Sequence, residues 1–212
     1  MHRLLLLTFL LAIASALTQA APIVQQPFVP AGSGAYTNLP SGQQIADDFT
    51  LAQSATIGSV QWWGRYDSTF VLADPVAFSI RFFQDTAGTP DIISFQSFSV
   101  TSTAVSTGFS FGGGTWFSYS SGLTPFTLSP GTYWVSIVEN DPRTAIGGTT
   151  QWLWADTNAA GLRTFRVGDG SAWTAALGVN HSFTLSETPE PSTLLLGAGG
   201  LGFLVIRRSR NR

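Results

Sequence analysis

The sequence of 212 residues contains no cysteine and no lysine. Without cysteine, the protein has no disulfide framework, no zinc–thiolate site and no cysteine nucleophile. Because lysine is absent, all ten basic residues are arginine. Stability must therefore come from packing, aided at most by a bound cation.

Positive charge is also scarce in the main part of the chain. Between residues 21 and 188, five arginines stand against eleven acidic residues, a net charge of −6, whereas the whole chain carries −2. Nucleic-acid-binding proteins gather lysine and arginine into positive patches because they contact phosphates. The charge balance therefore argues against a nucleic-acid partner.

Histidine is nearly absent, which restricts acid–base catalysis. His2 lies at the extreme N-terminus, and His181 lies in an alternating apolar stretch, where a structural histidine is the simpler interpretation. No Gly-x-Ser-x-Gly elbow is present, and the glycines at 112–114 lack the lysine of a phosphate-binding loop. The carboxylates that a glycosidase could use are Glu139, Asp156 and Asp169. We predict that the protein is not an enzyme and keep a glycan-active hydrolase as a minor alternative.

The N-terminus has the three parts of a signal peptide. His2 and Arg3 give a weakly positive start, residues 4–16 are apolar, and residues 18–20 (Thr-Gln-Ala) offer small side chains for cleavage. Residues 1–20 are therefore predicted to form a signal helix that directs export.

The C-terminus has the features of a second targeting signal. Pro189-Glu190-Pro191 precedes an uncharged apolar run at 192–206, which Arg207 and Arg208 follow. As a helix this run measures about 22 Å, short of the ~30 Å hydrocarbon core but able to span it if the arginines snorkel and the bilayer thins. Four basic and no acidic residues after 206 place this end in the cytoplasm. We predict a single transmembrane helix at 192–206, and a buried core helix is the alternative.

This order of motif, apolar helix and basic tail resembles the PEP-CTERM sorting signal of Gram-negative bacteria. The residues that carry the resemblance are Pro189, Glu190, Pro191, Arg207 and Arg208. The resemblance implies that an exosortase-type enzyme processes the chain near the Pro-Glu-Pro motif. It also implies association with exopolysaccharide, with a membrane-anchored stage before release to the cell surface or the extracellular space.

Residues 21–188 are predicted to form one exported domain. Short runs rich in β-branched and aromatic residues alternate with Gly/Pro turns, and residues 76–83 show the period-2 pattern of a half-buried strand. Residues 131–138 form the strongest candidate, a central strand, whereas residues 101–114, rich in Ser, Thr and Gly, suggest a mobile loop. No stretch has a convincing helical period. The predicted fold is all-β, an antiparallel two-sheet sandwich of jelly-roll or immunoglobulin-like type.

A second resemblance covers most of this domain. It is similar to a body often attached to PEP-CTERM signals, for which the resemblance implies no activity. The segments that carry the likeness are residues 46–49, 60–64, 78–83, 88–90 and 131–137.

Tryptophan is the most prominent residue type, with seven copies. Indole faces stack on the apolar faces of sugar rings, although tryptophan also serves simply as core bulk. Trp62 and Trp63 are adjacent on a predicted strand and must point to opposite faces, so only one can fill the core. Trp152 and Trp154 share a face, which would form a binding strip if it points outward. These four tryptophans are the candidate carbohydrate-binding residues.

Asp85 and Asp91 flank a turn whose oxygen atoms suggest a weak Ca²⁺ site, without the spacing of an EF-hand loop. The alternative is a solvated turn in which the carboxylates bond local backbone. No other cofactor is expected. The sequence thus predicts an exported structural or adhesive surface protein associated with exopolysaccharide, and a dedicated carbohydrate-binding module is the first alternative.

Overall fold

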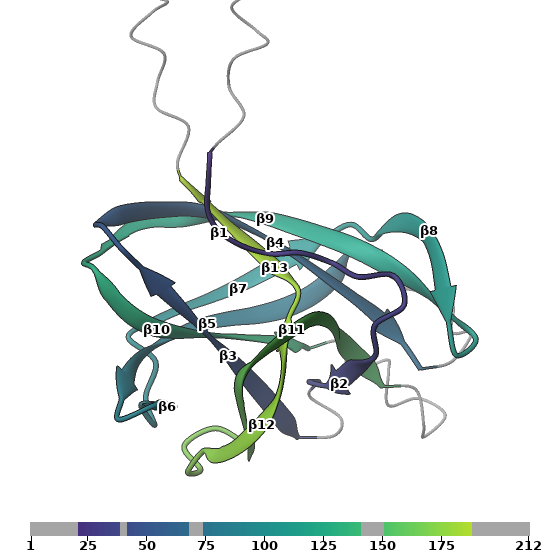
Figure 1. Cartoon of the computed structure of the whole chain (residues 1–212). Coiled ribbons are helices and arrows are strands. Elements are labelled where there is room, and N and C mark those ends of the chain that lie inside the picture. The colour runs from purple at the N-terminus through teal and green to yellow at the C-terminus, as the bar shows by residue number, and fades with distance from the viewer. Residues whose placement is uncertain (1–20, 39–41, 68–73, 141–150, 188–212) are drawn as a thin grey trace, which may run out of the picture.

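The computed structural model describes residues 21–38, 42–67, 74–140 and 151–187 (Figure 1). Within these ranges all regular secondary structure is β-strand, and every strand pair is antiparallel, which confirms the all-β prediction. In this part of the chain no helix has the length and apolar character needed to cross a membrane. The predicted signal helix at 1–20 and transmembrane helix at 192–206 lie outside the described residues.

Thirteen strands follow one another along the described chain. They are β1 (Pro22–Gln26), β2 (Gly34–Tyr36), β3 (Gln43–Leu51), β4 (Ala55–Tyr66), β5 (Val76–Thr86), β6 (Thr89–Pro90), β7 (Gln96–Ser102), β8 (Val105–Phe111), β9 (Gly114–Leu128), β10 (Gly131–Glu139), β11 (Trp152–Val167), β12 (Thr174–His181) and β13 (Phe183–Glu187).

Hydrogen bonds gather most strands into two sets. We call the set β8-β9-β4-β13-β1 sheet A and the set β7-β5-β10-β3-β11-β12 sheet B. The predicted central strand is β10, and it does lie between β3 and β5. β6 forms only a short hairpin with the end of β5, and β2 pairs with β11.

Strand β11 belongs to both sets. Its start, Trp152 to Trp154, pairs with β4, whereas Arg163 to Val167 pair with β3, and an irregularity in its pairing with β12 lies between Asp156 and Ala160. β-bulges bend a strand and increase its twist. A single continuous strand therefore crosses from one sheet to the other and ties them along one side.

The main hydrophobic core gathers side chains from strands of both sets. Trp62 of β4 packs edge-on against Phe78 of β5 with ring centroids 5.0 Å apart, and Phe82 packs against Phe126 of β9 at 4.9 Å. Phe78, Ile80 and Phe82 all face this core, as the alternation predicts. Phe83 points to the opposite face of β5, and it is also fully buried, in a small cluster with Trp134 and Ala46. The sequence suggests a half-buried strand, but at Phe82 and Phe83 β5 is buried on both faces.

The prediction of a mobile loop at residues 101–114 is wrong. Val105 to Phe111 form β8, which pairs with the beginning of β9. Gly112 and Gly113 make the turn with φ of 58° and 87°, a conformation that glycine adopts without steric cost. Composition misleads here because strand pairing uses the backbone, and serine and threonine allow it.

Candidate ligand-binding surfaces

The face that Trp152 and Trp154 share points inward, so they do not form the binding strip that an outward face would have made. Both side chains are 0% exposed, as is Trp62. Trp152 packs against Phe78 in the core at 5.3 Å, and Trp154 donates its indole N–H to the carbonyl of Ser182 at 3.0 Å. The two residues occupy the part of β11 that is shared between the sheets, where the core covers them. They are structural and are not available to a ligand.

Trp63 is the one candidate tryptophan that reaches the surface. It points away from Trp62, as the adjacent-residue argument predicts, and it is half-buried on the outer face of sheet A. Phe28 stacks on it with ring centroids 6.1 Å apart and planes 9° from parallel. Phe109 and Phe111 of β8 lie nearby and are 50% and 45% exposed. We call Phe28, Trp63, Phe109 and Phe111 the aromatic face.

No pattern in the sequence predicts this grouping. Phe28 follows β1 in a Pro/Gly-rich leader, and the two phenylalanines of β8 lie in the stretch that resembled a loop. Beneath them, Arg65 lies 5.2 Å from the ring of Trp116 and 5.9 Å from that of Phe111. Burial lowers the pKa of this arginine, and the charge of Asp67 opposes the shift. The cation helps to fix the aromatic side chains because it interacts with their ring faces.

Asp85 and Asp91 are engaged in hydrogen bonds, within their turn and, for Asp85, also to β10. Asp85 accepts from the indole N–H of Trp134 at 2.8 Å and from the backbone N–H of Gly88 at 3.2 Å, and Asp91 accepts from Thr86 Oγ1 at 2.5 Å. Nothing in the described ranges brings three His, Cys, Asp or Glu residues together as a metal site. The contacts correspond to the alternative in which the carboxylates support the turn.

A polar cluster is buried where β11 crosses between the sheets. Asp156 accepts from Ser33 Oγ at 2.6 Å, and its Oδ1 lies 3.0 Å from His181 Nδ1 and 3.4 Å from Arg163 Nη1. The imidazole is 0% exposed and stacks on Trp154 at 4.8 Å. Asp47 accepts from the backbone N–H of His181. These contacts make His181 the structural histidine that the sequence favoured.

Burial dominates the electrostatics of this cluster. It lowers the pKa of His181 against the opposing effect of Asp156, and it raises the pKa of Asp47 well above its usual value. Burial also acts to raise the pKa of Asp156, but the hydrogen bond and charge of His181, with Ser33 and Arg163, outweigh it and lower the pKa overall. The serine contacts the aspartate and not the histidine. A Ser-His-Asp relay needs the histidine in the middle, next to the serine.

The three carboxylates considered for a glycosidase occupy different surroundings. Glu139 is 0% exposed at the end of β10, and Asp156 is held in the buried cluster. Asp169 lies in the β11–β12 loop with a side chain that is 61% exposed, and its contacts are with Gln44, Arg81 and Arg166. Asp156 and Asp169 share no partner. The structure does not bring them together around one cleft.

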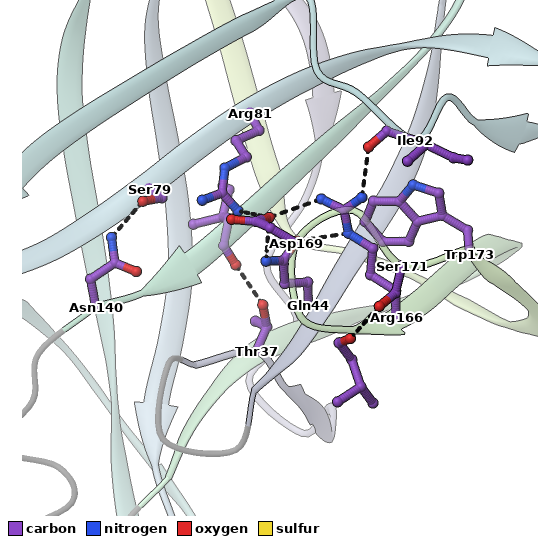
Figure 2. A network of polar contacts seen from close by, with 12 residues as sticks. Thr37, Gln44, Ser79, Arg81, Ile92, Asn140, Arg166, Asp169, Ser171 and Trp173 are labelled. Atoms are coloured by element: carbon purple, nitrogen blue, oxygen red, sulfur yellow. Dashed lines mark hydrogen bonds and ion pairs between the residues drawn. The ribbon is translucent and has the colours of Figure 1, made fainter.

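Asp169 is the centre of an arginine cluster on the outer face of sheet B (Figure 2). Its Oδ1 accepts from Arg81 Nη1 at 2.9 Å, from Arg166 Nη2 at 3.0 Å and from Gln44 Nε2 at 2.7 Å. These partners come from β5, β11 and β3. We call these four residues the arginine cluster. It holds the β11–β12 loop over the sheet face and so covers Phe83, Trp134 and Ala46.

Arg166 is unusually enclosed for a charged residue, with only 3% exposure. Its guanidinium lies 4.3 Å from the ring of Trp173 and 5.4 Å from that of Phe83, and it donates to Gln44 Oε1 at 2.9 Å and to the carbonyl of Ile92 at 2.8 Å. Burial lowers its pKa, and the charge of Asp169 opposes the shift. No sequence motif indicates this cluster, because its members are spread from residue 44 to residue 169.

No family model matches the chain, and the search of curated proteins finds no match either. The function must therefore be argued from the residues and their geometry.

Proposed function

We propose that the protein is an exported domain of the cell surface or extracellular matrix, with a structural or adhesive role in association with exopolysaccharide. In this proposal the signal peptide at 1–20 starts export, and the segment from Pro189 onward anchors the protein in the membrane until an exosortase-type enzyme processes it.

The observation that carries this proposal is the position of the two ends of the domain. Pro22 pairs with Ser186, and the backbone N–H of Glu187 donates to the carbonyl of Ala21 at 3.0 Å. Both ends therefore leave the domain side by side, and the β11–β12 hairpin lies at the opposite pole (Figure 1). A domain with this arrangement can be held at one pole while it presents the other.

We also infer that the domain is a two-sheet sandwich and that its connections favour a jelly-roll over an immunoglobulin-like order. The chain alternates repeatedly between the sheets, since it crosses from β3 to β4, β4 to β5, β7 to β8, β9 to β10 and β12 to β13, although β5 with β7, β8 with β9 and β11 with β12 pair within one sheet. Such alternation is the usual path in a jelly-roll, whereas immunoglobulin-like sandwiches have more neighbours within one sheet.

The test follows the full chain in its host cells. A variant with Pro189→Ala, Glu190→Ala and Pro191→Ala should stay unprocessed in the membrane fraction, while the parent protein is shortened and reaches the surface. Immunoblots of cell fractions, and digestion of intact cells by added protease, measure both. Glu187→Gln serves as the control, because it removes a nearby negative charge and leaves the motif intact. Equal processing and equal surface exposure of variant and parent would contradict the proposal.

A second candidate function is carbohydrate binding at the aromatic face. Next to Trp63, a row of polar side chains crosses the same face of sheet A, because Gln25 pairs with Thr184, Thr184 with Gln61 and Gln61 with Ser120. Aromatic rings stack on the apolar faces of sugars, and amides and hydroxyls bond their hydroxyl groups. The combination on one flat face favours a neutral glycan chain lying across the strands.

Titration of the full chain, in mild detergent, with cellohexaose tests this candidate. Trp63→Ala should weaken binding about five- to thirtyfold, because stacking on one aromatic ring contributes on the order of 1–2 kcal/mol. Phe165→Ala is the matched control, since this phenylalanine is 38% exposed on β11, outside the aromatic face. Equal weakening in both variants, or none in Trp63→Ala, would argue for a protein-binding or purely structural surface.

We propose no catalytic role. Three observations support this. His181 is fully buried, Ser33 bonds Asp156 and not the histidine, and Asp156 and Asp169 have different neighbours.

A further inference from the structure

We propose that Arg81 and Arg166 form a binding site for the carboxylate of an acidic sugar, and that Asp169 occupies this site as a built-in competitor. The inference deepens the proposed function and rests on it, because it names the class of exopolysaccharide that the surface takes: one that contains uronic acid units.

Asp169 fills the site incompletely. A guanidinium and a carboxylate bond best in a bidentate pair with both oxygens engaged. Here a single oxygen, Oδ1, serves Arg81, Arg166 and Gln44, and no described residue bonds Oδ2. Arg81 uses only Nη1 for a described hydrogen bond. A free carboxylate could offer one oxygen to each arginine.

Asp169 and Arg81 can be reached from the solvent. The side chain of Asp169 is 61% exposed and that of Arg81 is 18% exposed, so one side of the pair is open to solvent. Gly168 and Gly170 flank Asp169, both with φ of 79°, and no atom lies within 4 Å of the Cβ position of either. The space beside both flanking glycines is open, which leaves room for the carboxylate of Asp169 to turn away from the arginines.

Two hydroxyl groups lie on the same face of sheet B as the arginines. Thr164 pairs with Ala46, Ala46 with Ser136 and Ser136 with Arg81, so all four face the outer side of sheet B. Ser136 Oγ and Thr164 Oγ1 are buried, and neither has a hydrogen-bond partner among the described residues. Leaving a buried hydroxyl unpaired costs about 1–3 kcal/mol. A ligand that displaces Asp169 together with the β11–β12 loop could offer its oxygens to these two hydroxyls.

The half-buried indole of Trp173 gives the preference for a sugar acid over a small carboxylate. Its ring lies 4.3 Å from the guanidinium carbon of Arg166, and its N–H donates to the carbonyl of Asp91 at 3.0 Å. The ring is therefore fixed beside the arginines. It supplies an apolar surface next to the charge, which matches a sugar ring that bears a carboxylate.

The competitor sets the strength of binding. A group on the same chain acts at an effective concentration in the millimolar range, so a single uronate binds weakly while Asp169 is present. A polysaccharide offers many units and gains by avidity. Asp169→Asn removes the negative charge and keeps one oxygen to accept hydrogen bonds. It should therefore favour the external ligand.

The experiment titrates the full chain, in mild detergent and at low salt, with hexamers of galacturonic acid and records heat and tryptophan fluorescence. We expect Asp169→Asn to tighten binding at least about fivefold. Arg81→Gln should weaken it by a similar factor, and Arg81→Lys, which keeps the charge but not the bidentate geometry, should weaken it less. Glu187→Gln is the control for a general loss of negative charge. Urea unfolding of each variant confirms that it is folded.

If the arginine cluster only stabilises the fold, Asp169→Asn should not bind the hexamer more tightly than the parent. If folded Asp169→Asn binds the hexamer no better than the parent, or if Glu187→Gln gains as much, the proposal is wrong. If Asp169→Asn does not fold, Asp169→Ser takes its place with the same expectation. If Asp169→Asn tightens binding equally for a sulfated hexamer built of neutral sugars, the assignment to a carboxylate is overturned. Because this test uses purified protein, its failure leaves the test of export and surface exposure unaffected.

Discussion

Asp47 places a carboxyl group in the core with 0% exposure. Burial raises its pKa well above the usual value, with a smaller contribution from the charge of Asp48, while the backbone N–H of His181 and the charge of Arg163 act in the opposite direction. The folded state therefore binds a proton more tightly than the unfolded chain. Its contribution to stability is complete below about pH 4 and is lost as the pH rises toward the folded pKa.

Asp47→Asn should remove this loss. Asparagine keeps an oxygen to accept the N–H of His181 and has a donor where the protonated carboxyl has one. Each pH unit above about pH 4 costs the parent at most about 1.4 kcal/mol until the folded pKa is reached, so the stability that the variant gains relative to it should grow as the pH is raised from about 4 to about 7. Urea unfolding of the full chain at these pH values measures the difference. A gain that does not change with pH would contradict the role assigned to Asp47.

Single residues also show what the sequence could predict. The adjacency of Trp62 and Trp63 determines that they face opposite ways, because strand geometry alone fixes this. Burial of Trp152 and Trp154 could not be predicted, since it depends on β11 crossing between the sheets. The arginine cluster was equally hidden, because its partners come from three strands distant in sequence.

At the scale of elements, the contact between β4 and β11 depends on one glycine. A Cβ on Gly64 would overlap the indole of Trp152 and would lie 2.7 Å from the carbonyl oxygen of Leu153. Both neighbours are packed in the core, so they have no room to move. Gly64→Ala should therefore lower the free energy of unfolding by about 2 kcal/mol or more.

Gly122→Ala is the matched control for that prediction. Gly122 also lies in sheet A, on β9 opposite Ser59 of β4, and nothing lies within 4 Å of its Cβ position. Urea unfolding of both variants should show a large loss for Gly64→Ala and a small change of either sign for Gly122→Ala. Similar effects would mean that β-propensity and not the contact with Trp152 sets the cost.

Elements with regular alternation were predictable and irregular ones were not. The apolar alternation of β5 and the β-branched run of β10 identify both strands in the sequence. β8 was missed because six of its seven residues are exposed, so its sequence shows almost no apolar alternation. β11 was seen only in parts, since its two halves face different environments.

At the scale of the whole molecule, the all-β class follows from composition and turn spacing, but the pairing of strands does not. β1 and β13 are neighbours although more than 150 residues separate them, and no pattern in either segment predicts their pairing. The predicted location of the protein rests on segments 1–20 and 189–212, outside the described residues. The ligand classes proposed here rest instead on surfaces that only the folded domain assembles.

The pairing of β13 with a neighbour on each side has a mechanical consequence. β13 hydrogen-bonds to β1 along one edge and to β4 along the other, and it ends at the pole where the chain continues to its C-terminal segment. A glycan held at the β11–β12 pole and a tether at Glu187 would pull along the strand direction. The hydrogen bonds of both edges then bear the load in shear, all at once, instead of opening one after another. If the protein is attached and loaded as proposed, we expect the domain to resist force best along this axis.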